Sequence, residues 1–189
     1  MFFLILGTVL FLGIHSVRIF TPSWREARIA AIGEGPWKAA YSIASLAALV
    51  LMIWGYSLAR PEAPVLFEPP AWLKHVAVLL MLFAFILLAA SVLPAGRLKA
   101  AARHPMLVAI KTWAVAHLLA NGDLASIVLF GSFLAWAVAD RVSVKRRGDM
   151  GPPPGAAVWD VVAVLIGFLA YILFLWRLHA WLFGVSPLA

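Results

Sequence analysis

The stretch from Met106 to Ala139 reads MLVAIKTWAVAHLLANGDLASIVLFGSFLAWAVA, two apolar segments separated by Asn121-Gly122-Asp123. A glycine commonly ends one helix and an aspartate commonly caps the next, so the stretch predicts a tight helix–turn–helix. The segments Met106 to Ala120 and Leu124 to Ala139 each hold about 15 residues and span roughly 22 to 24 Å as helices. A hydrocarbon core is about 30 Å thick. We therefore expect a short helical hairpin, and its charge pattern leaves open whether it crosses the bilayer fully.

Four further apolar segments flank this hairpin, each bounded by Pro, Gly or charged residues. They are Phe2 to Phe20, Ala39 to Ala59, Trp72 to Leu93 and Ala156 to Phe183. Of the 189 residues, 65% are hydrophobic and only 12% are charged, whereas an ordinary globular domain is about half apolar and a quarter charged. This composition excludes a soluble protein. We predict an all-α, polytopic transmembrane helix bundle of about six membrane helices, with residues 1–189 as a single domain.

Basic residues concentrate in the first, third and fifth connections between the segments. The net charge of +7 is thus better explained by the preference of Lys and Arg for cytoplasmic loops than by binding to nucleic acid. The odd-numbered connections are predicted to be cytoplasmic and both termini periplasmic. The basic and proline-rich stretch Val142 to Gly155 is expected to form a partly extended strap at the lipid surface.

Residues that could carry chemistry are few. No cysteine is present, which excludes disulfides, thiolate nucleophiles and iron–sulfur clusters, and the carboxylates are scattered along the connections. His15 is expected in the inner half of the bundle, and His117 in its outer half or near its middle. An ionisable side chain at such a depth is a functional candidate. Alternatively, each histidine only forms a hydrogen bond to a neighbouring helix.

Two facing histidines without carboxylate or thiolate partners make a poor closed zinc site, which needs four ligands. They do suit a six-coordinate haem in an apolar bundle. His15 and His117 are therefore the candidate metal ligands and catalytic residues, and the haem propionates would need cationic partners. The candidate partners are Arg18, Arg103 and Lys111. Lys111 could instead donate a proton, or only reach toward the inner membrane interface.

His104 precedes Pro105, which fits the first turn of a helix, where a missing N–H does no harm. His104 and His117 lie roughly 140° apart around that helix. We therefore expect these two histidines to serve different neighbours.

Several motifs in combination resemble those of a known family. They are Gly13-Ile14-His15-Ser16-Val17-Arg18, Pro22-Ser23-Trp24-Arg25, Arg103-His104-Pro105-Met106-Leu107 and Trp113-Ala114-Val115-Ala116-His117-Leu118-Leu119-Ala120-Asn121-Gly122-Asp123-Leu124, followed by Leu129-Phe130-Gly131. Over most of its length the chain resembles the NnrU family of bacterial membrane proteins.

That family is named for an association with nitrite and nitric oxide reduction in denitrifying bacteria, and it includes the plastid 15-cis-zeta-carotene isomerase, a haem b enzyme. The resemblance implies a location in the bacterial inner membrane and a haem b with His15 and His117 as axial ligands. It also implies redox-gated cis–trans isomerisation of a hydrophobic polyene. The same motifs contribute further expected cofactor-site residues: His104, Trp113, Asn121 and Asp123.

Other functions stay open. One is a non-catalytic accessory protein that supports nitrite or nitric oxide reduction together with a redox partner. Another follows from a more distant likeness to isoprenylcysteine and phospholipid methyltransferases, which carry an Arg-His-Pro run beside S-adenosylmethionine. Their later acidic pair is incomplete here, because Arg141 to Gly155 contains only Asp149. A bundle whose histidines only bond neighbouring helices is the simplest alternative.

Overall fold

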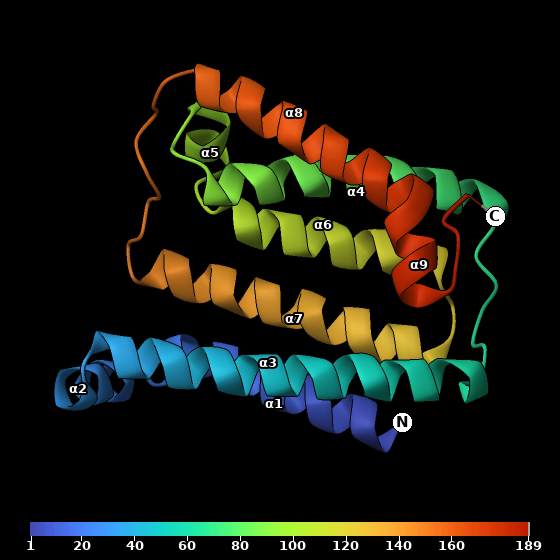
Figure 1. The fold of residues 1–189 in the computed structure, drawn as a ribbon, viewed down its shortest axis with the longest axis horizontal. Helices are drawn as coiled ribbons and strands as arrows, with labels where there is room; N and C mark the ends of the chain where they lie inside the picture. Colours follow the sequence, from blue (N-terminus) through green and yellow to red (C-terminus); the bar gives the residue numbers. More distant parts are fainter. Residues whose placement is uncertain (189) are drawn as a thin grey trace.

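The computed structural model describes residues 1–188, and its long helices pack side by side in a row (Figure 1). In the order of the row these are α8 (Val158–Leu173), α4 (Ala71–Val92), α6 (Pro105–Ala120), α7 (Leu124–Arg146), α1 (Phe2–Phe20) and α3 (Glu34–Ala59), each packed on the next. The shorter elements are α2 (Pro22–Ile32), η1 (Arg60–Glu62), α5 (Arg97–Ala102), η2 (Phe174–Leu178) and α9 (His179–Phe183).

This architecture confirms the predicted all-α transmembrane bundle with its helical hairpin. Five helical stretches are long and apolar enough to cross a membrane, namely α1, α3 with η1, α4, α7, and α8 continued to Phe183. α6 is shorter, with 16 residues, or about 24 Å of helix. Within residues 1–188 the chain is thus an integral membrane protein with five candidate spans and one short apolar helix.

Two connections differ from the predicted pattern. α7 continues beyond Ala139 to Arg146, because the intervening sequence contains neither Pro nor Gly to stop a helix. The second arm of the hairpin is therefore long enough to cross a bilayer, and the strap starts only after α7. Lys145 and Arg146 lie in the last helical turn, where positive charge suits the helix C-terminus. The first connection holds α2, an additional helix that begins at Pro22.

The tip of the α6–α7 hairpin is tied to the loop that follows α3. The backbone N–H of Leu66 donates to the carbonyl of Gly122 at 2.9 Å. A Cβ at Gly122 would overlap the carbonyl oxygen of Phe67, so the close approach requires glycine. Asp123 caps α7 as predicted, because its carboxylate accepts from the backbone N–H of Ser126 at 2.8 Å.

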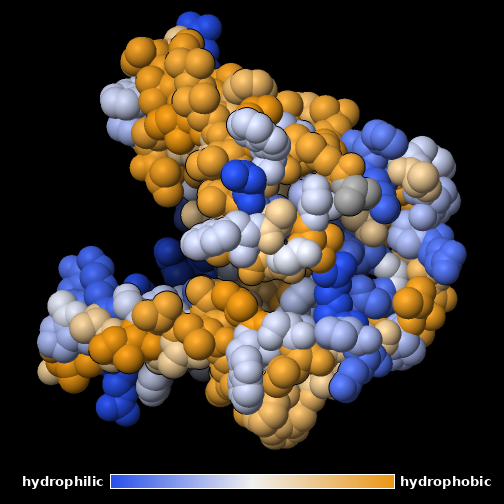
Figure 2. Space-filling model, turned by 45° about the vertical axis from the view of Figure 1, so that its right-hand side comes forward, coloured by the Kyte–Doolittle hydropathy of each residue, from blue (hydrophilic) through white to orange (hydrophobic). Residues whose placement is uncertain are grey.

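On the face shown in Figure 2, apolar side chains cover much of two arms, and a hollow with hydrophilic residues deep inside it separates these arms. Exposed large hydrophobic residues are spread along α1, α3, α4 and α8. Such surfaces suit a lipid environment, because lipid tails are as apolar as the side chains. The N-terminus and the last described residues lie at the same end of the bundle (Figure 1), as an even number of antiparallel long helices requires.

α1 and α3 approach closely through two glycines. A Cβ on Gly7 would lie 2.6 Å from the Cα of Met52, and a Cβ on Gly55 would overlap the backbone of Leu4. Small residues of this kind let membrane helices pack by van der Waals contact. Leu4 and Met52 belong to a buried core that residues of α6 and α7 join. The position of α1, and with it that of His15, depends on this contact.

Gly55→Ala is expected to push α1 away from α3 and to lower the free energy of unfolding by about 1–3 kcal/mol, the usual cost of overpacking. Gly13→Ala on α1 is the matched control, because nothing lies within 4 Å of a Cβ at that position. The control should be neutral or slightly stabilising. Thermal unfolding of the protein in detergent measures both, and equal stabilities of the two variants would contradict the close packing.

Candidate functional site

His15 on α1 is held in place by its own helix. Its Nδ1 lies 2.7 Å from the carbonyl oxygen of Phe11, and the two rings stack with centroids 4.2 Å apart. Because a carbonyl oxygen can only accept, Nδ1–H is the donor. In the neutral ring the lone pair is then on Nε2, which forms no hydrogen bond with any residue from 1 to 188.

His117 on α6 repeats this arrangement. Its Nδ1–H donates to the carbonyl of Trp113 at 2.9 Å, and its ring stacks on Phe130 of α7 at 4.4 Å between centroids. A metal-binding histidine typically donates its second ring N–H to a carbonyl or carboxylate, which fixes the tautomer and the ring orientation. His15 and His117 are both half-buried, and both have Nε2 in the form that a metal ligand needs.

The ring of Phe133 on α7 lies between the levels of the two histidines. It contacts the rings of Phe11 and Trp113, with centroids 5.8 and 5.3 Å away. His15 is one helical turn beyond Phe11. His117 is one turn beyond Trp113 in the opposite direction, because α1 and α6 run antiparallel (Figure 1).

The Cα atoms of His15 and His117 are therefore about 12 Å apart along the bundle axis, given a rise of about 1.5 Å per residue. The Nδ1–H of each imidazole points to a carbonyl in the preceding turn of its own helix. The two nitrogens of an imidazole point in divergent directions, so each Nε2 points away from that carbonyl. The structure does not bring the two histidines into contact.

A cleft of about 600 Å³ opens beside the C-terminal part of α1 and the start of α6. It brings together four of the predicted site residues, which are His15, Arg18, Arg103 and His104. Tyr41 and Trp136 form its wall beside His15, with ring centroids 5.3 and 6.2 Å from the imidazole. A pocket of this size is in the range that holds small-molecule ligands. The cleft is therefore the candidate ligand-binding site of the described chain.

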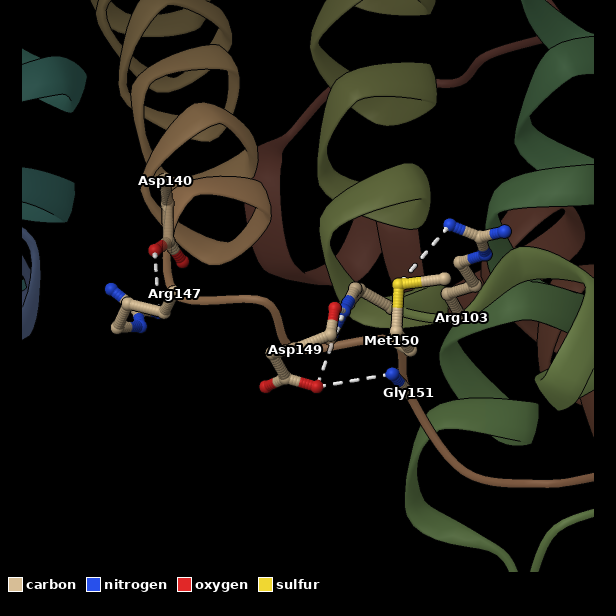
Figure 3. A network of polar contacts seen from close by, with 7 residues as sticks. Arg103, Asp140, Arg147, Asp149, Met150 and Gly151 are labelled. Carbon is tan, nitrogen blue, oxygen red and sulfur yellow. Dashed lines mark hydrogen bonds and ion pairs between the residues drawn. The ribbon is translucent and has the colours of Figure 1, made fainter.

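The strap that follows α7 passes beside Arg103 (Figure 3) and contributes Asp149 to the wall of the cleft. A Cβ on Gly151 would lie 2.8 Å from the Cα of Arg103, so a glycine lets the strap pack on that backbone. Arg103 has a φ of +60°, which is uncommon for a residue other than glycine and is often found at functional sites. The strap thus lies directly against the backbone of Arg103, two residues before α6 begins.

Asp149 of the same strap interacts with His104. The Nε2 of His104 lies 3.1 Å from the backbone carbonyl oxygen of Asp149, and the Asp149 carboxylate accepts from the N–H of Gly151 at 3.0 Å. This backbone N–H lowers the pKa of Asp149 below its ordinary value, and the charges of His104, Arg18 and Arg147 lower it further. Asp149 is consequently a carboxylate at neutral pH.

The remaining motif residues lie toward the other end of α6. Asn121 donates from its side-chain amide to the carbonyl of His117 at 2.9 Å. Asp123 accepts from the hydroxyl of Ser126 at 2.7 Å, and that hydroxyl lies 2.8 Å from the hydroxyl of Tyr56 on α3. These polar groups hold the hairpin against α3. Their expected contribution to a cofactor site stays a prediction.

Lys111 lies half-buried in the middle of α6 and is not part of the wall of the cleft. Arg18 and Arg103 therefore line the same cleft, whereas Lys111 lies outside it. Within residues 1–188 no three His, Asp or Glu side chains gather as a metal-binding group.

The aromatic side chains of α7 were not indicated by the apolar pattern. They are Phe130, Phe133 and Trp136, and each contacts a histidine or the ring one turn before it. Their spacing of three residues, which keeps them near one helix face, is the signal that could have selected them. Phe11 and Trp113 offered a second signal, because each precedes a histidine by four residues.

These features define a polytopic helical membrane protein with two internal histidines and a basic cleft at one end. A family model described as NnrU protein matches residues 3–187, nearly the whole chain. The chain belongs to the NnrU family, which confirms the resemblance of its motifs. No curated protein and no solved structure matches it.

Asp123→Ala is expected to lower the free energy of unfolding by about 1–2 kcal/mol, because α7 loses the acceptor at its N-terminus. Asp123→Asn should keep most of the stability, since asparagine is an equally good cap. Thermal unfolding in detergent compares the two variants with the unchanged protein. If the cap did not contribute to stability, the two variants and the unchanged protein would unfold at the same temperature.

Proposed function

We propose that this NnrU-family protein binds haem b within the membrane, and that His15 and His117 would be the protein ligands of its iron. The observation that carries the proposal is the pair of matching bonds from Nδ1–H to the carbonyls of Phe11 and Trp113. Both bonds leave Nε2 as the nitrogen with the free lone pair, in the tautomer that a metal ligand needs. Two imidazoles in an apolar bundle are a suitable ligand set for a six-coordinate haem.

The donor atoms fit a haem, whereas the position of one aromatic side chain does not. The ring of Phe133 occupies the level between the two histidines, in contact with Phe11 and Trp113. A flat ligand shared by His15 and His117 therefore requires this ring to turn aside and the two helices to adjust. Because protein interiors are closely packed, this rearrangement costs free energy, which the binding of the ligand has to supply.

The chain itself would supply orientation and exclusion of water. The aromatic rings of Phe11, Trp113, Phe130 and Phe133 surround the two histidines with apolar surface. Arg18 and Arg103 lie in the same cleft as His15, which is compatible with their expected pairing with acidic groups of the ligand. Haem b, when bound, supplies a redox-active iron in this dry site.

The finer part of the proposal is redox-gated cis–trans isomerisation of a polyene lipid. What supports it is the family, whose members include a haem b isomerase, together with the apolar aromatic surroundings that a long conjugated chain would contact. A bacterial inner-membrane location with periplasmic termini belongs to the same proposal. A non-catalytic role beside nitrite or nitric oxide reductases is the alternative that the test below distinguishes.

The visible absorption spectrum of protein purified from haem-supplemented cells, oxidised and then reduced with dithionite, tests haem binding. We expect a low-spin b-type spectrum for the unchanged protein, and its loss or conversion to a high-spin spectrum in His15→Ala and in His117→Ala. His75→Ala is the control, because His75 is exposed at the start of α4. Phe133→Ala should bind haem at least as well as the unchanged protein, since it removes the ring that fills the gap.

A colourless unchanged protein would exclude the haem proposal. A normal low-spin spectrum in both histidine variants would exclude His15 and His117 as the ligands. With haem bound, incubation of the reduced protein with a cis-polyene such as a poly-cis carotene, followed by chromatography of the isomers, tests the activity. Conversion supports the isomerase, and its absence in haem-loaded protein favours the accessory role.

A further inference from the structure

The cleft at the basic end of the bundle contains more cations than its carboxylates can pair. Lys38 is bound to Glu34 at 2.8 Å, and Arg147 lies 3.9 Å from Asp140 (Figure 3). Lys99 donates from Nζ to two backbone carbonyl oxygens at the end of α4, at 2.7 and 2.8 Å. These interactions engage half of the lysines and arginines that line the cleft.

The guanidinium groups of Arg18, Arg25 and Arg103 are the other half, and within residues 1–188 none of them forms an ion pair. The side chain of Arg103 lies 3.9 Å from the sulfur of Met150 (Figure 3), which is only a weak acceptor. These three arginines come from the end of α1, from α2 and from the turn before α6, three elements that only the tertiary fold brings together.

Trp136 lines the same cleft. Its indole N–H is buried and has no hydrogen-bond acceptor among the described residues. Buried polar groups in proteins nearly always have a partner. Arg18 and Arg103 are exposed and Arg25 is half-buried, so the three side chains are accessible to an acceptor with negative charge in the cleft that Trp136 also lines.

Part of the remaining wall is apolar, and another part carries the carboxylates of Glu34, Asp140 and Asp149. The apolar lining residues are Ile14, Val17, Pro105, Met106, Leu107 and Val144. A small hydrophilic anion would leave this surface without a partner, whereas an amphiphile would cover it with its chain while its charged end meets the arginines. The strained backbone of Arg103, with its φ of +60°, fits a residue that is kept in place for binding.

We propose that the cleft binds the phosphate-bearing headgroup of a lipid, held by the guanidinium groups of Arg18, Arg25 and Arg103 and by the indole N–H of Trp136. Arginine is suited to this task, because its planar group donates two parallel hydrogen bonds to a phosphate. The site goes beyond haem binding, and haem-free protein is used to test it. Failure of haem-free protein to retain the lipid would overturn this proposal alone, and failure to bind haem would leave it standing. Both proposals use Arg18 and Arg103, and the competition with haem described below decides which ligand these two residues bind.

Native mass spectrometry of haem-free protein with equal amounts of phosphatidylglycerol and phosphatidylcholine measures the preference. We expect the unchanged protein to retain phosphatidylglycerol. Arg18→Gln, Arg25→Gln and Arg103→Gln should each weaken that retention by about tenfold or more, the usual effect of losing a hydrogen bond between charged groups. Trp136→Phe keeps the ring and removes the N–H, so a smaller loss of a few-fold is expected.

Two arginines that lie outside the cleft are the matched controls. Arg28 is on α2 with its guanidinium 5.5 Å from the ring of Trp24, and Arg146 is exposed in the last turn of α7. Arg28→Gln and Arg146→Gln remove the same charge near the same end of the bundle. Retention should be unchanged in both, because neither side chain lines the cleft.

Two competition experiments identify the molecule that supplies the phosphate or acidic group. Displacement of phosphatidylglycerol by inorganic phosphate at low concentration would show that a free anion suffices and would overturn the lipid proposal. Persistence of the lipid in haem-loaded protein supports a separate lipid site, whereas its displacement by haem would assign the arginines to the haem propionates and overturn the proposal. Equal retention of the two lipids, or equal losses in the control and cleft variants, would also overturn it.

Discussion

The position of α7 between α1 and α6 is the constraint on which the rest of the molecule depends. α7 packs on both helices, and through them it joins α3 on one side with α4 and α8 on the other. Its N-terminal end is fixed because the Asp123 carboxylate accepts from Ser126, whose hydroxyl reaches Tyr56 on α3. In a membrane such polar contacts and close van der Waals packing hold helices together, because burial of apolar surface gives no advantage there.

One consequence of this arrangement concerns the two histidines. α1 runs parallel to α7 and α6 runs antiparallel to it, so the same ring of Phe133 meets Phe11 on one side and Trp113 on the other. His15 and His117 follow these two residues by one turn in opposite directions. Any ligand that joins the two histidines must therefore displace the ring of Phe133. The movement of this side chain decides whether a flat molecule fits between the helices.

The two ends of the bundle differ in how their polar groups are used. At the hairpin tip, hydrogen bonds engage the side chains of Asn121, Asp123 and Ser126 with one another, with backbone or with α3. At the basic end, Arg18 and Arg103 retain guanidinium groups without a carboxylate partner in residues 1–188. Satisfied polar groups stabilise a structure, whereas the exposed guanidinium groups of Arg18 and Arg103 stay accessible to an anionic ligand. The basic end is accordingly where binding is expected.

The sequence by itself determined the membrane class, the hairpin and the cap on α7, because hydrophobic length and turn chemistry act locally. It also selected His15 and His117, since a polar side chain within an apolar run is conspicuous. Only the tertiary structure decided that Phe133 lies between them, that Lys111 is apart from Arg103, and that Arg25 joins the cleft. These facts depend on which helix faces are neighbours and in which direction the helices run. Apolar periodicity does not encode them, because in a bilayer the lipid-facing and the protein-facing sides of a helix are equally hydrophobic.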